Sequence, residues 1–270
     1  MERIFFRSMQ DSKAAKTNSS YRIGVTGLGQ GVGTTFVATA LAFYFRDQGY
    51  SVSFTECLQP ASCRSLYYDQ VAMDKRFAYR RFEDIYQRLQ EEGPLSPSVN
   101  HESGIIWRLP TPDNCKSRLQ LTAQQQTRLV TTGREEVCIF DMETDYSWDD
   151  FLVDMDVIFV VTDPLPSKLI RSRERYRVLK KMELSGCRMI WIVNKTNDGI
   201  DKKQVKNYLK ADKVYWLEAF SAATVYEDEY LCRFHWENEE IQRKMTAIFT
   251  KVSRIHGSLS WFSISKDVEI

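Results

Sequence analysis

Apolar positions along the chain fall into two alternating patterns. Short apolar or β-branched runs of strand length occur at residues 22–26, 52–55, 137–141, 157–162 and 189–193. Between the first two runs, Val37, Leu41 and Phe45 recur at helical spacing, and Gly49 is a helix stop signal. Alternating strands and helices are typical of one parallel sheet covered by helices. We therefore predict an α/β fold, with a mainly parallel sheet and helices on both faces, in a single domain over residues 21–257.

The middle and the end of this domain carry weaker patterns. Residues 73–92 have apolar groups at helical spacing before Gly93-Pro94, which predicts a helix, and residues 94–102 read as a loop. A strand is expected at residues 104–109 and a helix at 122–132. The last third predicts a short strand at residues 215–217 and a helix at 239–255.

The two ends of the sequence lack such patterns. Residues 1–20 read as a flexible leader and residues 258–270 as a tail without a cationic amphipathic helix. The chain has no apolar run of 18 residues, and its six cysteines include no Cys-x-x-Cys pair, which favours reduced thiols in the cytoplasm. Its three histidines lie far apart, so neither a zinc site nor a catalytic triad is supported, and we assign no catalytic residue.

A glycine-rich loop follows the first predicted strand. Residues 27–36 read GLGQGVGTTF and lead into the first predicted helix. In a phosphate-binding loop of this kind, backbone amides surround the phosphates at a helix N-terminus, a lysine neutralises charge and a hydroxyl holds magnesium. Thr35 supplies the hydroxyl, but Thr34 stands where the lysine is expected. A plain strand-to-helix turn is the alternative for the loop taken alone.

The loop and the order of the surrounding elements resemble the MinD/ParA family of deviant Walker A ATPases, which includes the pilus localisation proteins TadZ and CpaE. The family pattern Lys-Gly-Gly-x-Gly-Lys-Thr-Thr falls on residues 29–36. The first lysine, which in the family reaches a dimer partner's nucleotide, is Gly29 here. The second lysine, which contacts the β- and γ-phosphates, is Thr34, and the final hydroxyl residue is Phe36. The resemblance implies a P-loop NTPase architecture with a degenerate phosphate loop.

The resemblance also implies a site for ATP or ADP with Mg²⁺. The metal positions are Thr35, Glu56 and Asp141, where Asp141 ends an apolar strand in the Walker B manner and Leu58 replaces the family's second carboxylate after strand two. Many buried parallel strands end in Asp, so this pattern alone is common. The nucleotide-binding positions are Gln30, Gly31, Val32, Gly33, Thr34, Thr35, Phe36, Asn194 and Lys195.

Two further segments and one residue, Asn194, resemble the family. Residues 163–167 are similar to its Thr-x-Pro-x-Pro turn, and residues 221–229 resemble the loop that lies beside the base. Asn194 stands where the family recognises the adenine edge, although an ordinary polar residue at a strand end explains it equally well. Asn197 occupies the position at which guanine-specific relatives carry Asp, which disfavours GTP.

Positive charge gathers in two segments, although the net charge is only +1. Residues 168–181 and 202–213 read as basic helices, and such runs are usually solvated helix faces. The alternatives are an acidic protein partner, a membrane surface and nucleic acid. We predict a partner surface at Arg171, Arg173, Arg175 and Arg177.

These features together predict a divergent MinD/ParA-like protein with a degenerate nucleotide site that binds ATP weakly or not at all. It would be a pseudo-ATPase that acts as a localisation or assembly factor through protein contacts, and a homodimer is one assembly that the resemblance allows. The first alternative is a slow genuine ATPase in which an arginine, Arg64 or Arg171, replaces the missing lysines. The second is a nucleic-acid-binding module that uses the basic helices.

Overall fold

The computed structural model describes residues 20–58, 70–71, 73–75, 78–79, 82–93, 95, 100–111, 121–142, 144 and 148–256. Its strands are β1 (Tyr21–Gly27), β2 (Val52–Cys57), β3 (Met73–Lys75), β4 (Ala78–Tyr79), β5 (His101–Glu102), β6 (Ile105–Arg108), β7 (Val137–Met142), β8 (Val157–Thr162), β9 (Met189–Thr196) and β10 (Val214–Glu218). Its helices are α1 (Thr34–Asp47), α3 (Ile85–Gln90), α4 (Ala123–Thr131), α5 (Asp149–Leu152), α6 (Pro166–Arg171), α7 (Arg173–Leu184), α8 (Lys202–Leu209), α9 (Ala222–Tyr230) and α10 (Glu239–His256), with a 3₁₀ turn η3 (His235–Glu237). The predicted leader, the tail and Arg64 lie outside the described residues.

Eight of these strands form one sheet in the order β10-β9-β8-β1-β7-β2-β6-β5. All neighbouring pairs are parallel except β5 with β6. Parallel strands buried on both faces need near-continuous apolar sequence, and β2, β7 and β8 are buried along their whole length. The predicted α/β fold with a mainly parallel sheet is confirmed.

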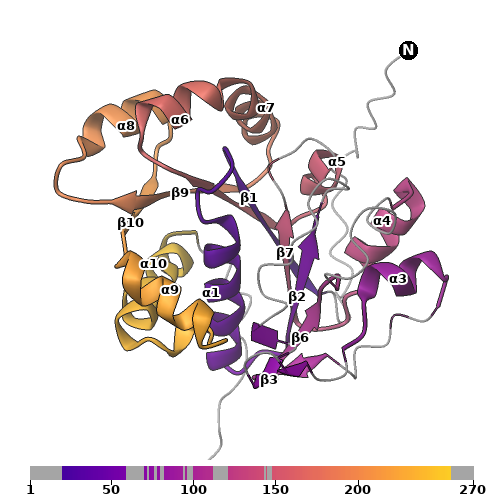
Figure 1. Cartoon of the computed structure of the whole chain (residues 1–270). Coiled ribbons are helices and arrows are strands. Elements are labelled where there is room, and N and C mark those ends of the chain that lie inside the picture. The colour runs from indigo at the N-terminus through magenta and orange to yellow at the C-terminus, as the bar shows by residue number, and fades with distance from the viewer. Residues whose placement is uncertain are drawn as a thin grey trace, which may run out of the picture.

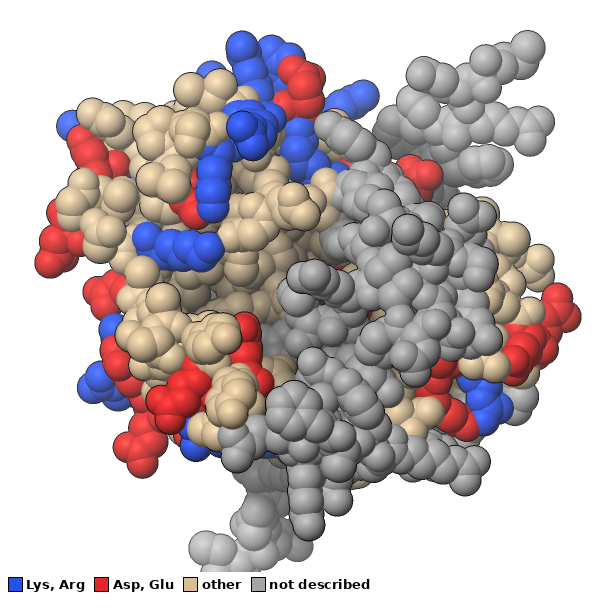
Figure 2. All heavy atoms as spheres, viewed as in Figure 1, with Lys and Arg blue, Asp and Glu red and all other residues tan. Residues whose placement is uncertain are grey.

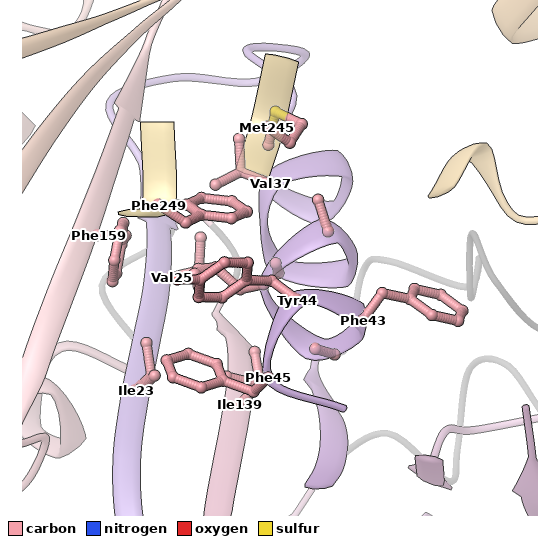
Figure 3. Packing of buried hydrophobic residues seen from close by; sticks show 14 of the residues in the cluster. Ile23, Val25, Val37, Phe43, Tyr44, Phe45, Ile139, Phe159, Met245 and Phe249 are labelled. Atoms are coloured by element: carbon pink, nitrogen blue, oxygen red, sulfur yellow. The ribbon is translucent and has the colours of Figure 1, made fainter. Parts of the chain in front are cut away.

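Helices cover both faces of the sheet (Figure 1). On one face α1 and α10 pack against β1 and β8, and Figure 3 shows Tyr44, Phe45 and Phe249 between α1 and the strands. Phe43 points away from this group in the same view and packs edge-on against Phe234, with ring centroids 4.8 Å apart. The second face carries its own core, to which α3, α4, α5, α6, α7 and α8 contribute buried apolar residues. The predicted two-sided covering is confirmed.

Two local predictions are wrong. Residues 73–92 do not form one helix, because β3 and β4 pair as an antiparallel ladder and, of the described residues in this segment, only those of α3 are helical. Asp84 starts α3 by accepting hydrogen bonds from the amides of Tyr86 and Gln87, which fixes the first turn late in the segment. The segment 221–229, expected as a loop, is nearly all helix α9, with Ser221 at its N-cap.

The carboxyl ends of the central strands gather the residues singled out from the sequence. The loop after β1 contacts Asn194 at the end of β9, and Asp141 near the end of β7 lies opposite Val25 and Glu56 in the sheet register. Ligands of open α/β sheets bind at this edge. Among the described residues, no helix is long and apolar enough to cross a membrane.

Candidate functional site

The phosphate loop, defined here as residues 27–33, ends in a left-handed turn. Gly31 has φ +69° and Gly33 has φ +92°, a region that side-chain-bearing residues rarely adopt. Gly33 is the N-cap of α1, and no side chain caps this end of the helix. The first amides of α1 are therefore available to an anion, which a helix N-terminus favours through its dipole.

Two side chains from the end of β9 hold this loop. Asn194 Nδ2 donates to the Val32 carbonyl at 2.8 Å, and Asn194 Oδ1 accepts from the Lys195 amide at 2.8 Å. Lys195 Nζ donates to the Gly31 carbonyl at 2.7 Å, and its backbone takes the left-handed conformation with φ +59°. Each polar atom of the Asn194 amide makes one of these hydrogen bonds, so the second Nδ2 hydrogen and the second Oδ1 lone pair are not used by them.

Each of the two positions that lack lysine has one close side-chain contact. A Cβ atom at Gly29 would lie 2.8 Å from Ser172 Oγ, closer than real side chains approach. Thr34 turns its side chain back to the end of β1, since a Cβ at Gly27 would lie 2.6 Å from Thr34 Oγ1. The N-terminus of α1 thus has no side-chain cap, and neither Gly29 nor Thr34 supplies a cation beside it.

Two carboxylates lie side by side below the loop. Glu56 on β2 and Asp141 on β7 are direct neighbours in the sheet register, and both are buried. Burial, followed by the charges of Asp141 and Glu56, raises the pKa of the Cys57 thiol well above its usual value. Carboxylate oxygens with the Thr35 hydroxyl in the first turn of α1 suit Mg²⁺, a hard cation that prefers oxygen ligands. These residue types fit the metal that the sequence implies.

The sequence matches no protein-family model and no curated protein significantly. Solved structures, in contrast, resemble the fold over most of the chain. A ParA family ATPase from Chlorobium tepidum superimposes with a TM-score of 0.69 at 13% identity, covering 86% of this chain and 98% of that one. MinD in the MinC:MinD cell division complex of Aquifex aeolicus gives 0.67 at 13% identity, with 87% and 96% covered. The septum site-determining protein MinD of Pyrococcus horikoshii, complexed with Mg-ADP, gives 0.63 at 10% identity, with 88% and 98% covered.

The chain has the MinD/ParA fold. This is the fold that the loop and the strand order predicted. Phe36 stands at the position where the resemblance leads one to expect a hydroxyl residue. The Phe36 ring packs against Phe220 at 5.5 Å and against His235 at 5.3 Å between ring centroids. An apolar contact therefore replaces a polar group at the start of α1.

One predicted partner-surface residue is buried in this MinD/ParA fold. Arg175 is only 4% exposed, so its inclusion in the partner surface is wrong. Its guanidinium forms an ion pair with Asp149 and donates to Thr26 Oγ1 at 3.0 Å. The helical repeat explains this, because α7 turns Arg175 toward the sheet and leaves Arg173 and Arg177 exposed.

The remaining arginines do lie at the surface. Arg171 closes α6, and Arg173 and Arg177 lie on α7, so the basic run is two helices joined at Ser172. Figure 2 shows Lys and Arg gathered over α6 and α7, and acidic side chains gathered near α9 and α10. Exposed Leu165 and Ile170 lie beside the arginines of α6 and α7 in the sequence.

Sequence reasoning missed three contacts of the site: Ser172 against Gly29, Arg175 on Thr26, and the hold of Asn194 and Lys195 on the loop. Each joins residues more than 140 positions apart in the chain. A sequence signal existed for Asn194 and Lys195, which follow each other at a predicted strand end, and for neither of the other two contacts.

Proposed function

We propose that this protein is a cytoplasmic localisation or assembly factor that binds ATP or ADP with Mg²⁺ weakly or not at all. Residues 21–257 act as one domain, and the output is a protein contact rather than rapid hydrolysis. The contact surface consists of Arg171, Arg173 and Arg177, and a protein with complementary negative charge is the expected partner. A homodimer is the alternative assembly.

The observation that carries this proposal is that neither of the two positions at which the family has lysine holds a cation here. Gly29 lies against Ser172, and the shorter Thr34 turns toward Gly27. Phosphoryl transfer depends on cations that meet the developing charge on the phosphates. Without either lysine, a bound nucleotide would be held mainly by backbone amides and by the metal at Thr35, Glu56 and Asp141.

Calorimetry with Mg-ATP tests the nucleotide part of the proposal. We expect affinity weaker than micromolar for the native protein. Thr34→Lys should tighten binding by about tenfold, since a charge-assisted contact contributes roughly 1.5–3 kcal/mol. Thr34→Gln is the matched control, as it adds length without charge. Sub-micromolar affinity that survives Thr35→Ala would contradict the site.

Lys195 favours one second candidate, a slow genuine ATPase. Its Nζ lies 2.7 Å from the Gly31 carbonyl, so a cation is already in contact with the loop, although it is a lysine and not the arginine expected from the sequence. Lys195→Gln would then lower an ATPase rate that Lys213→Gln, an exposed lysine in the turn before β10, leaves unchanged. No measurable rate in the native protein removes this candidate.

A further inference from the structure

Two buried side chains from other elements hold the backbone just past β2. The Leu58 amide donates to Tyr86 Oη at 2.8 Å, and Tyr86 Oη donates to the Glu56 carbonyl at 2.8 Å. The Leu58 carbonyl accepts from Trp148 Nε1 at 3.2 Å. Tyr86 belongs to α3 and is 0% exposed, and Trp148 is the N-cap of α5 and is 1% exposed. We call this pair of side chains the clamp.

The clamp begins where the sheet stops providing partners. The ladder of β2 with β6 ends at Thr55, and its ladder with β7 ends at Cys57. A buried backbone amide or carbonyl without a partner destabilises a fold, and a tyrosine hydroxyl can donate and accept at once. The hydroxyl of Tyr86 thus bridges residues 56 and 58, as one residue of a neighbouring parallel strand would do.

Both members of the clamp have supports of their own. The Tyr86 amide donates to Asp84 Oδ1 at 2.9 Å in the first turn of α3. The other oxygen of this carboxylate accepts from the Thr111 amide at 2.9 Å and from the Thr111 hydroxyl at 2.6 Å. Asp84 is 8% exposed, so these hydrogen bonds are shielded from water. Trp148 packs against Phe151 of α5, with ring centroids 5.6 Å apart. The clamp is therefore held in place independently of any ligand.

The clamp acts on the backbone of a candidate metal ligand. Glu56 lies beside Asp141 in the sheet register, and both carboxylates belong to the proposed Mg²⁺ site. The Glu56 carbonyl is one of the two groups that Tyr86 bridges, so the backbone that carries this carboxylate is fixed on its C-terminal side. Mg²⁺ demands near-ideal octahedral geometry, and a ligand that is held in position in advance costs less to order on binding.

We propose that Tyr86 and Trp148 are positioning residues for the Mg²⁺ site, and that they hold Glu56 next to Asp141 before any metal binds. The role in metal binding rests on the proposed function, whereas the clamp itself is a property of the fold. Groups that orient a metal ligand without touching the metal typically contribute about 10–100-fold to metal affinity. Since the clamp holds the backbone, the end of β2 keeps one conformation with and without metal.

Amide hydrogen exchange at Leu58, followed by NMR on the full chain, tests the clamp without a ligand. In Tyr86→Phe the ring still fills its site but the Leu58 amide loses its acceptor, and we expect its exchange to accelerate at least about tenfold. Tyr176→Phe is the matched control, because it removes another tyrosine hydroxyl that donates to a backbone carbonyl, that of Leu209 at 2.9 Å.

The control should leave exchange at Leu58 unchanged. Equal exchange at Leu58 in Tyr86→Phe and Tyr176→Phe overturns the clamp. Protection of the native Leu58 amide that develops only after Mg²⁺ is added also overturns it, because the metal would then order the end of β2.

Mn²⁺ binding, measured by the relaxation of water protons, tests the positioning role. Mn²⁺ is used alone, since it prefers the same oxygen ligands as Mg²⁺. We expect Tyr86→Phe to bind Mn²⁺ about tenfold more weakly than the native protein, Tyr176→Phe to bind it equally, and Asp141→Ala to lose the bound metal. Equal affinity in the two tyrosine variants means that the clamp does not position Glu56, and the proposal is wrong. If the native protein binds no Mn²⁺, the metal part of the proposed function is wrong and the positioning role with it, while exchange at Leu58 still decides the clamp.

Trp148→Phe covers the case in which Tyr86→Phe does not fold. It removes the donor to the Leu58 carbonyl and leaves the bridge through Tyr86 in place. We expect Mn²⁺ to bind several-fold more weakly and the Leu58 amide to exchange several-fold faster. Trp191→Phe is the matched control, because Trp191 is equally buried and its Nε1 donates to Glu183 at 2.9 Å. Equal Mn²⁺ affinity and equal exchange at Leu58 in the two tryptophan variants overturn the proposal.

Discussion

At the scale of single residues, Gly33 controls both the loop and its attachment to β9. We expect Gly33→Ala to destabilise the protein by about 1–3 kcal/mol, because the residue has φ +92° and the new Cβ would overlap Asn194 Nδ2. Gly31→Ala is the matched control, since Gly31 also has positive φ but a Cβ there meets nothing within 4 Å. Urea unfolding of both variants measures the difference. Equal losses would mean that Asn194 does not press on the loop.

The buried ion pair of Arg108 and Glu135 makes the free energy of unfolding depend on pH in the acid range. Burial raises the pKa of the Glu135 carboxyl, but the charge of Arg108, together with hydrogen bonds from the backbone, Arg108 and Ser53, more than offsets this, and the pKa is lowered. A lowered carboxyl pKa adds stability above the usual carboxyl range, and this stability is lost as the pH falls through the folded-state pKa.

Glu135→Gln tests this acid dependence. We expect a loss of about 3–5 kcal/mol at neutral pH, because Arg108 stays buried without its charged partner. The variant should also lose less stability than the native protein between pH 7 and pH 3. Glu174→Gln, an exposed carboxylate on α7, is the control and should follow the native curve. Parallel curves for Glu135→Gln and the native protein would contradict the assigned pKa direction.

At the scale of elements, the outward side of α7 carries the partner prediction. Reversing Arg173 and Arg177 to Glu should abolish recruitment of an acidic partner while changing the free energy of unfolding by no more than about 1 kcal/mol, as for exposed substitutions. Partner capture and thermal unfolding measure the two effects. Retained capture would exclude this surface. Loss of salt-dependent DNA binding in the same variant would instead support the nucleic-acid module that the basic helices also suggested.

Elements with strong periodicity were predictable from the sequence. The strands that became β1, β2, β7, β8 and β9 are largely buried and rich in apolar or β-branched residues, and their positions agree with the structure within a few residues. Helix α1 followed from Val37, Leu41 and Phe45, all buried, and Gly49 adopts φ +85° just after it. Because these segments must bury their apolar side chains, few other local conformations are open to them.

Segments whose structure depends on distant partners were not predictable. Residues 73–92 have helical spacing, but the pairing of β3 with β4 and the cap at Asp84 restrict the helix to α3. The Asp84 carboxylate also accepts a hydrogen bond from Thr111. In α7, the basic run did not indicate that Arg175 is the arginine that points inward and contacts Thr26. Sequence spacing gives the side of a helix on which a residue lies, but only the packed fold tells which side is buried.

At the scale of the whole molecule, the fold and the sheet edge that carries the site are those predicted from the sequence. The contacts within the site join distant residues and were not predictable from it. The sequence shows that both lysines are absent, but the contact of Gly29 with Ser172 and the turn of Thr34 toward Gly27 required the fold. The MinD/ParA fold is thus kept in a chain whose phosphate loop is held by its own side chains, Asn194 and Lys195.

The steady-state ATPase rate of the full chain, measured with Mg²⁺ beside the Asp141→Ala variant, tests the central claim most directly. The proposed function predicts no rate above background in either protein, because two cations and one carboxylate of the family pattern are replaced at Gly29, Thr34 and Leu58. A robust rate in the native protein that Asp141→Ala abolishes would contradict the pseudo-ATPase and establish a genuine ATPase in its place.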